Sequence, residues 1–322
     1  MKSHQSILTL IAACTLIACG GGGGGTSATM TPVAVTPVVT PPAVTTPQVP
    51  ITAVNAKAVG AVALEASVNP LGVLGVAGAL DVLGRNFTPN VFTQAQVCPS
   101  GGTAVMGSNI TDPRLLNVGD RFSATFSNCG VAQDAGFVIT LTGSVASTVT
   151  FFTAIRDQYQ STMEALGSSF ANRNYQFSGT QISIFEKINQ TLLGYTITGP
   201  STKVKITNGT LVRNNVWQDY RQIALFANGT TSYTMTATIQ TDNTNVSAVN
   251  GNFVTNTTLP IVRNTTTGLL SAGSISVVGA SNSRLTLTVN ADGSTTIQVD
   301  ANGDGVFEAT QTATAAELRA LE

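Results

Sequence analysis

The sequence is poor in histidine and in charge. It has a single histidine, His4, and only 10% of its 322 residues are charged. A chain with no histidine beyond its first residues lacks the general base of a serine–histidine triad or a cysteine–histidine pair, and it cannot form a histidine-ligated zinc or iron site. Paired carboxylates are the remaining catalytic option, and no acidic residue is marked out for that role by its neighbours. We therefore expect a protein that is not an enzyme.

Basic residues are also few. The 15 lysines and arginines are scattered among 16 acidic residues, which gives a formal net charge of −1 at pH 7. Nucleic-acid binding depends on a basic patch, so the sequence predicts no nucleic-acid partner. Threonine, serine and asparagine supply the polarity instead. That composition is typical of a β-rich domain outside the cytoplasm.

Of the four cysteines, Cys19 has the most informative surroundings. Leu16, Ile17 and Ala18 precede it at the end of an apolar segment that starts near residue 7, and six glycines follow it. That segment is shorter than the roughly 20 residues of a membrane-spanning helix. Lys2 gives it the positive start of a signal peptide. The pattern predicts a cleaved N-terminal segment and not a transmembrane anchor.

These residues resemble the lipobox of bacterial lipoproteins, which are cut before a cysteine that then carries the lipid. The resemblance implies that residues 1–18 are a signal peptide and that Cys19 is lipidated, with palmitate among its acyl chains. Gly20 after the cysteine implies the outer membrane, with the protein on its periplasmic or its surface face. Several acyl chains hold a protein on a membrane effectively permanently, at about 0.8 kcal/mol per buried methylene. An ordinary secretory signal is the alternative.

Cleavage before Cys19 also removes His4 and Cys14. Cys98 and Cys129 then remain as the thiols without a lipid, and an even pair in an oxidising compartment predicts a disulfide. Because the bond closes a loop of about 30 residues, the chain-entropy model makes it worth about 3 kcal/mol.

Residues 19–50 predict a tether between the lipid and a folded domain. Glycine fills the first part of this segment, and proline recurs every few residues in the second. Proline-rich chain favours the extended polyproline II conformation, which rises about 3.1 Å per residue. We expect residues 51–322 to form a single β-rich domain beyond this tether.

The domain is predicted to begin with an apolar helical segment, residues 51–84, which is rich in Ala, Val, Leu and Gly. A pair of apolar helices packed against a sheet is the favoured interpretation. A membrane hairpin is the alternative, and Glu65, Pro70 and Asp81 argue against it because charge and proline are costly inside a bilayer.

Residues 87–312 are predicted to form strands, because β-branched runs alternate with turns rich in glycine and asparagine. The clearest strands are 284–290, 294–300 and 306–312, which read as a meander, and residues 313–322 read as a short helix. Residues 151–170 differ, since their apolar residues recur at helical spacing. We expect a helix there, with a strand as the alternative.

These predictions give a mainly β fold. The strands are expected to form either one large, curved antiparallel sheet or a sandwich, with the apolar N-terminal helices packed on it. Uncharacterised proteobacterial outer-membrane lipoproteins resemble this chain in the stretches 98–102, 118–130 and 141–145 and in the ending from residue 278. That resemblance supports the outer-membrane location and the mainly β fold, and it implies no activity.

The sharpest polar motif is a possible calcium loop. Asp300, Asn302, Asp304 and Glu308 place oxygen atoms at alternating positions around two glycines, as calcium loops do. The helices that flank an EF-hand loop are missing. A glycine-rich turn, in which the Asp and Asn side chains cap their own backbone, is the alternative that we favour.

Two functional hypotheses remain. The first is a membrane-anchored, non-catalytic lipoprotein that binds another component of the envelope, such as a protein. The second is a carrier of lipid or another apolar ligand, held in a cavity between the sheet and the N-terminal helices. Trp217 and Tyr220 are candidates for a ligand platform, although a lone tryptophan more often serves packing.

Overall fold

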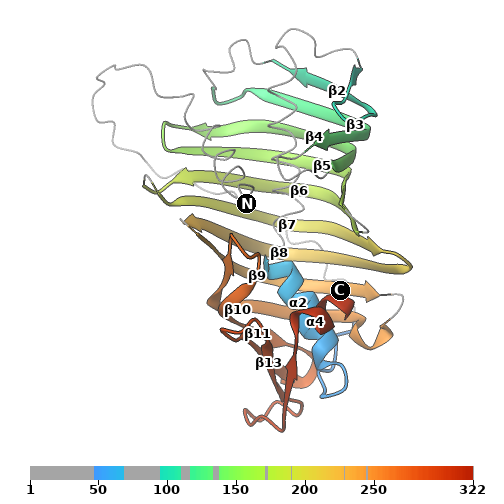
Figure 1. Ribbon diagram of the computed structural model, residues 1–322, viewed down its shortest axis with the longest axis vertical. Helices are drawn as coiled ribbons and strands as arrows, with labels where there is room; N and C mark the ends of the chain where they lie inside the picture. Colours follow the sequence, from blue (N-terminus) through green and yellow to red (C-terminus); the bar gives the residue numbers. More distant parts are fainter. Residues whose placement is uncertain are drawn as a thin grey trace.

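The computed structural model describes residues 47–68, 95–109, 117–132, 138–170, 173–189, 191–227, 229–243 and 246–321. Within these ranges, fourteen strands form one open antiparallel sheet in which each strand pairs with the next along the chain (Figure 1). The mainly β fold is confirmed, and of the two predicted arrangements the single large sheet is found. The strands are β1 Gln96–Val97, β2 Thr103–Ser108, β3 Arg121–Ala132, β4 Val138–Phe152, β5 Arg156–Phe170, β6 Arg173–Lys187, β7 Leu193–Asn208, β8 Leu211–Ala227, β9 Thr230–Asn243, β10 Gly251–Asn264, β11 Leu270–Val278, β12 Arg284–Val289, β13 Thr295–Asp300 and β14 Ala309–Ala313.

Tight turns make this simple strand order. Asn208 at the end of β7 pairs with Leu211 at the start of β8, so only two residues connect them. The first of these, Gly209, has φ +60°, a conformation that glycine adopts without strain. Strands β4 to β8 each have 15 to 17 residues, longer than most strands. The sheet therefore offers broad faces.

Strand β8 shows why the sheet has one buried face. Alternate residues of a strand point to opposite faces, and alternate residues of β8 are buried. Asp219 has φ +47°, and the register with β9 shifts between Gln218 and Arg221. This bulge places Trp217 and Tyr220 on the same face. We call the buried face of the sheet its inner face and the opposite one its outer face.

Residues 151–170 form the end of β4, a turn and β5, so the predicted helix is wrong. Tyr159 and Met163 are four residues apart, which places two residues on one side of a helix but equally on one face of a strand. A bulge at Ala165, with φ +47°, then returns Leu166 to the inner face. A bulged strand thus produced the helical spacing.

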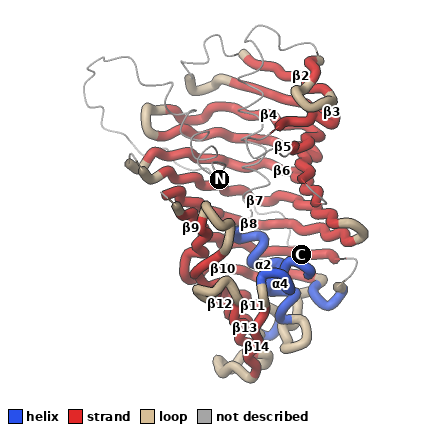
Figure 2. The backbone as a smooth tube through the Cα atoms, viewed as in Figure 1, coloured by secondary structure: helices blue, strands red, loops and turns tan. Residues whose placement is uncertain are grey.

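The described helices lie at the C-terminal end of the sheet (Figure 2). They are α2 (Ala56–Val68) and α4 (Ala315–Leu321), with the short 3-10 turns η1 (Ser247–Val249) and η2 (Ala280–Asn282). Helix α4 confirms the predicted C-terminal helix. It begins with a capping box, in which the amide of Glu317 donates to Thr314 Oγ1 and the amide of Thr314 donates to Glu317 Oε2.

Helix α2 lies against β9 to β13 and α4. All of its residues except Lys57 are buried. A Cβ added to Gly60 would lie 3.1 Å from Leu287 Cδ1, so this glycine lets the helix approach the strands closely. Leu285, Leu287 and Ile297 are fully buried beside it. Helix α2 corresponds to the first part of the predicted 51–84 segment, and residues 69–84 lie outside the described ones.

The chain enters the domain beside β10. The amide of Val49 donates to the carbonyl of Asn252, and the amide of Asn252 donates to the carbonyl of Pro47. Val49 and Ile51 are both buried. Residues 47–50, the last of the predicted tether, are therefore fixed against the sheet.

Candidate functional site

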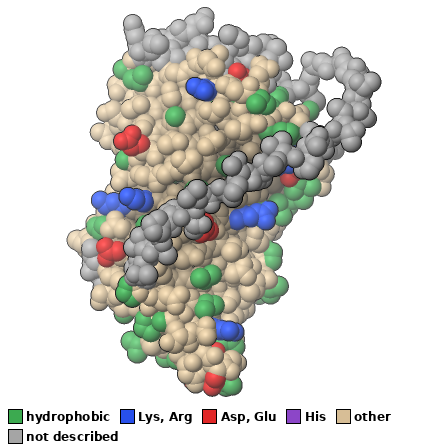
Figure 3. Space-filling view, turned by 180° about the vertical axis from the view of Figure 1, so that it is seen from behind, with side chains coloured by type: hydrophobic (Ala, Val, Ile, Leu, Met, Phe, Trp, Pro, Cys, Tyr) green, Lys and Arg blue, Asp and Glu red, His purple; other side chains and the backbone are tan. Residues whose placement is uncertain are grey.

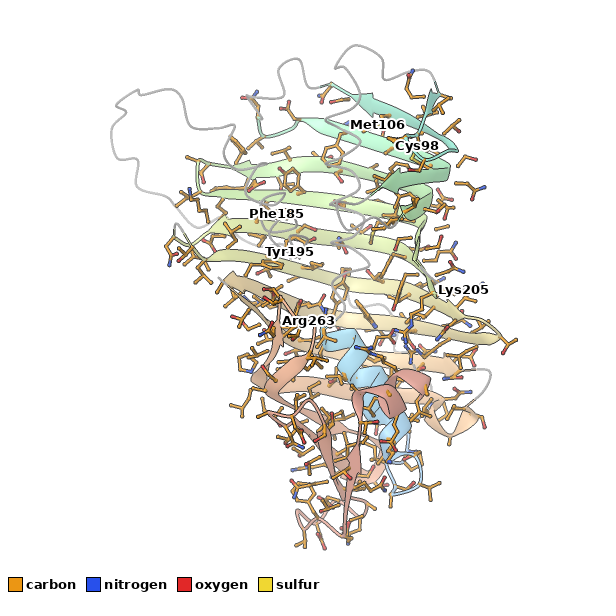
Figure 4. All side chains as sticks on the ribbon, in the orientation of Figure 1. Cys98, Met106, Phe185, Tyr195, Lys205 and Arg263 are labelled. Carbon is orange, nitrogen blue, oxygen red and sulfur yellow. A yellow bond between two sulfur atoms is a disulfide. The ribbon has the colours of Figure 1, made fainter. Side chains whose placement is uncertain are left out.

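Four aromatic rings cross the inner face in a row. Phe122 of β3 contacts Tyr159 of β5 with ring centroids 6.1 Å apart, and Tyr159 contacts Phe185 of β6 at 6.0 Å, both edge to face. Phe185 lies directly opposite Tyr195 of β7, with centroids 4.5 Å apart. Figure 4 shows these last two on neighbouring strands. We call these four residues the aromatic row.

Hydroxyl and amide groups lie beside the aromatic row on the same face. Ser147 and Ser161 are hydrogen-bonded at 2.8 Å across β4 and β5. Gln181 of β6 donates to Ser183 at 3.2 Å, and Tyr195 donates to the same hydroxyl at 3.4 Å. All of these groups are buried. They form the first part of a polar band across the sheet.

The polar band continues onto β7 and β8. The hydroxyl groups of Thr202 and Tyr220 lie 2.9 Å apart, and Tyr220 also donates to Gln181 Oε1 at 3.4 Å. Burial raises the pKa of Tyr220 to about 12 and raises that of Tyr195 as well. Both phenols are therefore neutral hydrogen-bonding groups at physiological pH. We define the polar band as Ser147, Ser161, Gln181, Ser183, Thr202 and Tyr220.

One carboxyl group belongs to this region. Asp157 is 8% exposed and accepts a hydrogen bond of 2.8 Å from the hydroxyl of Tyr159. Burial raises the pKa of Asp157, and the Tyr159 hydrogen bond acts in the opposite direction. The aromatic row and the polar band contain no lysine or arginine. Asp157 therefore brings a carboxyl group into hydrogen-bonding contact with the aromatic row.

Four buried polar atoms on β8 and β9 have no hydrogen-bond partner. They are Asn215 Oδ1, Trp217 Nε1, Gln222 Oε1 and Thr241 Oγ1, and their residues are at most 5% exposed. Asn215 and Thr241 are directly opposite each other. A buried polar atom without a partner costs about 1–3 kcal/mol, and such atoms in folded proteins usually meet water or a ligand. This part of the inner face therefore has unused hydrogen-bonding capacity.

The predicted platform residues lie at the centre of this region. Trp217 and Tyr220 contact each other edge to face, with centroids 5.9 Å apart. Both are buried, and the Tyr220 hydroxyl belongs to the polar band. Sequence reasoning named this pair and missed the aromatic row and the remaining polar groups.

The end of α2 is linked to the inner face by a buried ion pair. Glu65 pairs with Arg213 of β8, and its other oxygen accepts a 3.3 Å hydrogen bond from Tyr175. Gln222 Nε2 donates to the carbonyl groups of Ala66 and Ser67. A buried charge is tolerated when it is paired. In the sequence, Glu65 served only as evidence against a membrane hairpin, and its partner was not predicted.

The four predicted calcium residues lie in one loop between β13 and β14. Carboxylate oxygens of Asp300, Asp304 and Glu308 lie within 4.8 Å of one another. Asp300 accepts hydrogen bonds from the amides of Gly303 at 2.7 Å and Gly305 at 2.9 Å.

The other three predicted residues bond in the same way, and Asp304 Oδ1 accepts from the amide of Val306 at 2.8 Å. Asn302 Oδ1 accepts from the amide of Asp304, and Glu308 accepts from the amide of Ala301. The geometry is that of a self-capped turn, and calcium binding stays a prediction. Because this loop extends to Glu308, the last strand begins at Ala309 and not at residue 306, where it was predicted to begin.

The predicted disulfide is present. Cys98 and Cys129 are bonded with their Cα atoms 5.4 Å apart, which ties the segment before β2 to β3 at the N-terminal end of the sheet. Cys19, the predicted lipidation site, lies outside the described residues.

The outer face has a different character. A hollow of about 500 Å³ lies over β2 to β5, where Gly107, Ser123 and Ala146 follow one another across the strands. Arg121 is the charged residue among those that line it. On the side shown in Figure 3, uncharged side chains predominate and charged ones are scattered.

The comparisons with known proteins give no relative. No family model matches the chain, and neither a curated protein nor a solved structure matches it. No described helix has the length and apolar character needed to cross a membrane.

Proposed function

We propose that this protein is a non-catalytic binding module of the cell envelope, attached to the outer membrane through lipidated Cys19. Its ligand binds on the inner face of strands β3 to β9. The lipobox-like residues 16–19 and the tether support the attachment to the outer membrane. The four unpartnered atoms carry the proposal for the binding face.

Those atoms favour binding over simple packing for an energetic reason. A sheet face that serves only as a core gains most from aliphatic side chains, whereas Asn215, Trp217, Gln222 and Thr241 each keep a buried polar atom without a partner. A ligand with hydrogen-bonding groups recovers that free energy. The aromatic row lies on the same face and meets β8 opposite Ala224, farther along the strand from Trp217, which lies opposite Thr202.

Trp217 provides a direct test, because it is the only tryptophan in the chain. The intact protein, purified in detergent, is titrated with solubilised fractions of the cell envelope while its emission is recorded. A saturable shift of the emission is expected, and it should be reduced in Asn215→Leu. Equal shifts in wild type and Asn215→Leu, or no shift with any fraction, would contradict binding at this face.

The anchor has a separate test with a matched control. Cells that express the protein are labelled with radioactive palmitate and fractionated. Cys19→Ser should lose the label and leave the outer-membrane fraction, whereas Cys14→Ser should keep both, because Cys14 lies within the predicted signal peptide. Label retained by Cys19→Ser would refute the lipid anchor.

A second candidate function is a carrier of lipid or another apolar ligand. One part of the inner face supports it, since the buried residues there are apolar. They are Phe126, Leu141, Val145, Met163, Leu166 and Phe177. Native mass spectrometry of the intact protein decides between the candidates. Lipid that stays bound beyond the covalent acyl chains favours the carrier, and a mass without such lipid counts against it.

A further inference from the structure

We propose that the loops around the point where the tether joins the domain dock on the membrane that holds the lipid anchor. The side chains that enter the membrane surface are Val54, Val306 and Phe307. This inference rests on the proposed attachment through Cys19, and it assigns a membrane-facing end to the domain. Three features of these loops support it: their position, their exposed apolar side chains and their charge.

The end of the tether and the loop between β13 and β14 contact the same element, the 3-10 turn η2. The amide of Ala280 in η2 donates to the carbonyl of Val49 at 2.9 Å. In the loop after β13, a Cβ added to Gly303 would lie 2.6 Å from the carbonyl oxygen of Ser281, so this loop also packs on η2. Figure 1 shows the β13–β14 loop and the segment before α2 together at the lower end of the molecule. The tether therefore joins the domain beside these loops.

Both loops expose large apolar side chains. Val54 is 93% exposed in the turn before α2, and Val306 and Phe307 are 64% and 43% exposed in the loop after β13. The two loops are neighbours, since Gln311 of β14 donates to the carbonyl of Ala53. Among the aromatic side chains whose burial the structure describes, Phe307 is the exposed one. Aromatic rings are favoured at the boundary between water and lipid, and exposed apolar side chains that gather at one place mark a contact surface.

A few side chains are enough for docking because the tether keeps these loops near the membrane. The predicted tether runs from the lipid on Cys19 to Pro47, whose carbonyl accepts a hydrogen bond from Asn252 at the start of β10. A flexible linker holds its two ends at an effective concentration of about millimolar. Apolar contacts that are too weak to bring a free protein to a membrane therefore hold a tethered domain on it.

The acidic residues of the β13–β14 loop determine which membrane surface suits it. Asp304 and Glu308 are exposed on either side of Val306 and Phe307. Their carboxylate oxygens and one of Asp300 lie within 4.8 Å of one another, which concentrates negative charge there. An anionic lipid surface repels such a loop, and a surface of neutral headgroups does not. We expect docking on neutral lipid and weaker docking as the fraction of anionic lipid rises.

Labelled cysteines test the docking on the full-length, lipidated protein. Val306→Cys and Leu259→Cys each add one free thiol, because Cys98 and Cys129 are bonded to each other and Cys19 carries the lipid. A polarity-sensitive dye is attached to each variant, and the proteins are reconstituted into phosphatidylcholine vesicles. We expect the emission of the dye at position 306 to shift to shorter wavelength. A nitroxide on the acyl chains should quench it.

Leu259 is the matched control, since it is 60% exposed and lies farther along β10 than Asn252, where the tether joins. Its dye should keep the emission that it has in water. In the Val306→Cys background, Phe307→Ser should remove most of the shift with little change in melting temperature, because a substitution of an exposed loop residue rarely affects stability. Phosphatidylglycerol in the vesicles should reduce the shift, and salt should restore part of it.

The outcomes separate this inference from the lipid anchor. Protein that does not stay with the vesicles refutes the anchor, and the docking falls with it. Protein that stays with the vesicles while the dye at position 306 reports water refutes the docking alone, because the tether then holds the domain away from the membrane. Equal shifts at positions 306 and 259 would also overturn the docking, since the contact would not be specific to these loops.

Discussion

The two ends of the inner face are built from different residues. In β10 to β13, around α2, the buried residues are mainly aliphatic or aromatic, and Phe253, Ile275, Val277 and Leu287 are completely buried. In β4 to β8, hydroxyl, amide and charged groups lie among them, for example Gln181. The C-terminal end therefore supplies most of the hydrophobic stabilisation. Polar groups in β4 to β8 add little stability for their number, and the proposed binding face on strands β3 to β9 includes them.

The strongest test of this comparison truncates the C-terminal core. Leu287 is fully buried beside Gly60 of α2, so Leu287→Ala should lower the free energy of unfolding by about 2–5 kcal/mol. Urea denaturation measures the change. Leu259→Ala is the control, since Leu259 is 60% exposed and its truncation should cost less than about 0.5 kcal/mol. Similar losses in both variants would show that this end is not the main core.

The polar part of the face can be divided by a second pair of variants. Gln181 bonds to Ser183 and Tyr220, so Gln181→Leu should cost about 1–3 kcal/mol by leaving those hydroxyls without this partner. Asn215→Leu removes an oxygen that has no partner, so it should leave stability within about 0.5 kcal/mol of wild type or raise it.

Chemical denaturation of both variants, beside the binding titration, checks this contrast. We expect Asn215→Leu to lose binding while it keeps its stability. If Asn215→Leu is as destabilising as Gln181→Leu, Asn215 is structural. The distinction between polar groups with a hydrogen-bond partner and polar groups without one would then disappear.

A smaller effect concerns pH, and it should have opposite signs at the two ends. Burial raises the pKa of Asp157 above its ordinary value of 3.8. Its contribution to stability is therefore complete below that value and is lost as the pH rises through the higher pKa of the folded state. Hydrogen bonds from Ser294 lower the pKa of Asp292, in the turn after β12. Its contribution is present above 3.8 and is lost as the pH falls through the folded-state pKa.

Melting temperatures between pH 3 and 7 test these signs. Relative to Asp157→Asn, the wild type should lose stability as the pH rises. Relative to Asp292→Asn, it should gain stability over the acidic part of the range. The same trend in both comparisons would mean that Asp157 is not desolvated in the folded protein.

Much of the C-terminal end could be predicted from the sequence. In residues 285–289, apolar and hydroxyl residues alternate without interruption. This repeat of two residues is that of a strand with one buried face, so it predicts the strand directly. The disulfide followed from the count of cysteines, and Thr314 with Glu317 has the spacing of a helix cap. The strand and the helix cap depend on residues that are close in the sequence. The disulfide had only one possible pairing, because two cysteines remained.

The candidate site could not be predicted in the same way. Tyr159 meets Phe185 only because the β5–β6 turn sets the register and the bulge at Ala165 changes which residues face inward. One misplaced bulge reverses the face of every following residue. The pairing of Glu65 with Arg213 depends on where α2 crosses the sheet, which no local pattern determines.

The smallest expected effect concerns the loop between β13 and β14, and it tests whether the C-terminal end needs a metal ion. Both oxygens of Asp300 accept backbone hydrogen bonds, and Glu308 accepts another. A calcium ion would have to compete with bonds that the loop already makes, so millimolar calcium should change the melting temperature by less than about 1 °C. Scanning calorimetry with calcium and with a chelator measures this. A clear rise with calcium that Glu308→Gln abolishes would make the loop a metal site, and part of the stability of the C-terminal end would then depend on the ion.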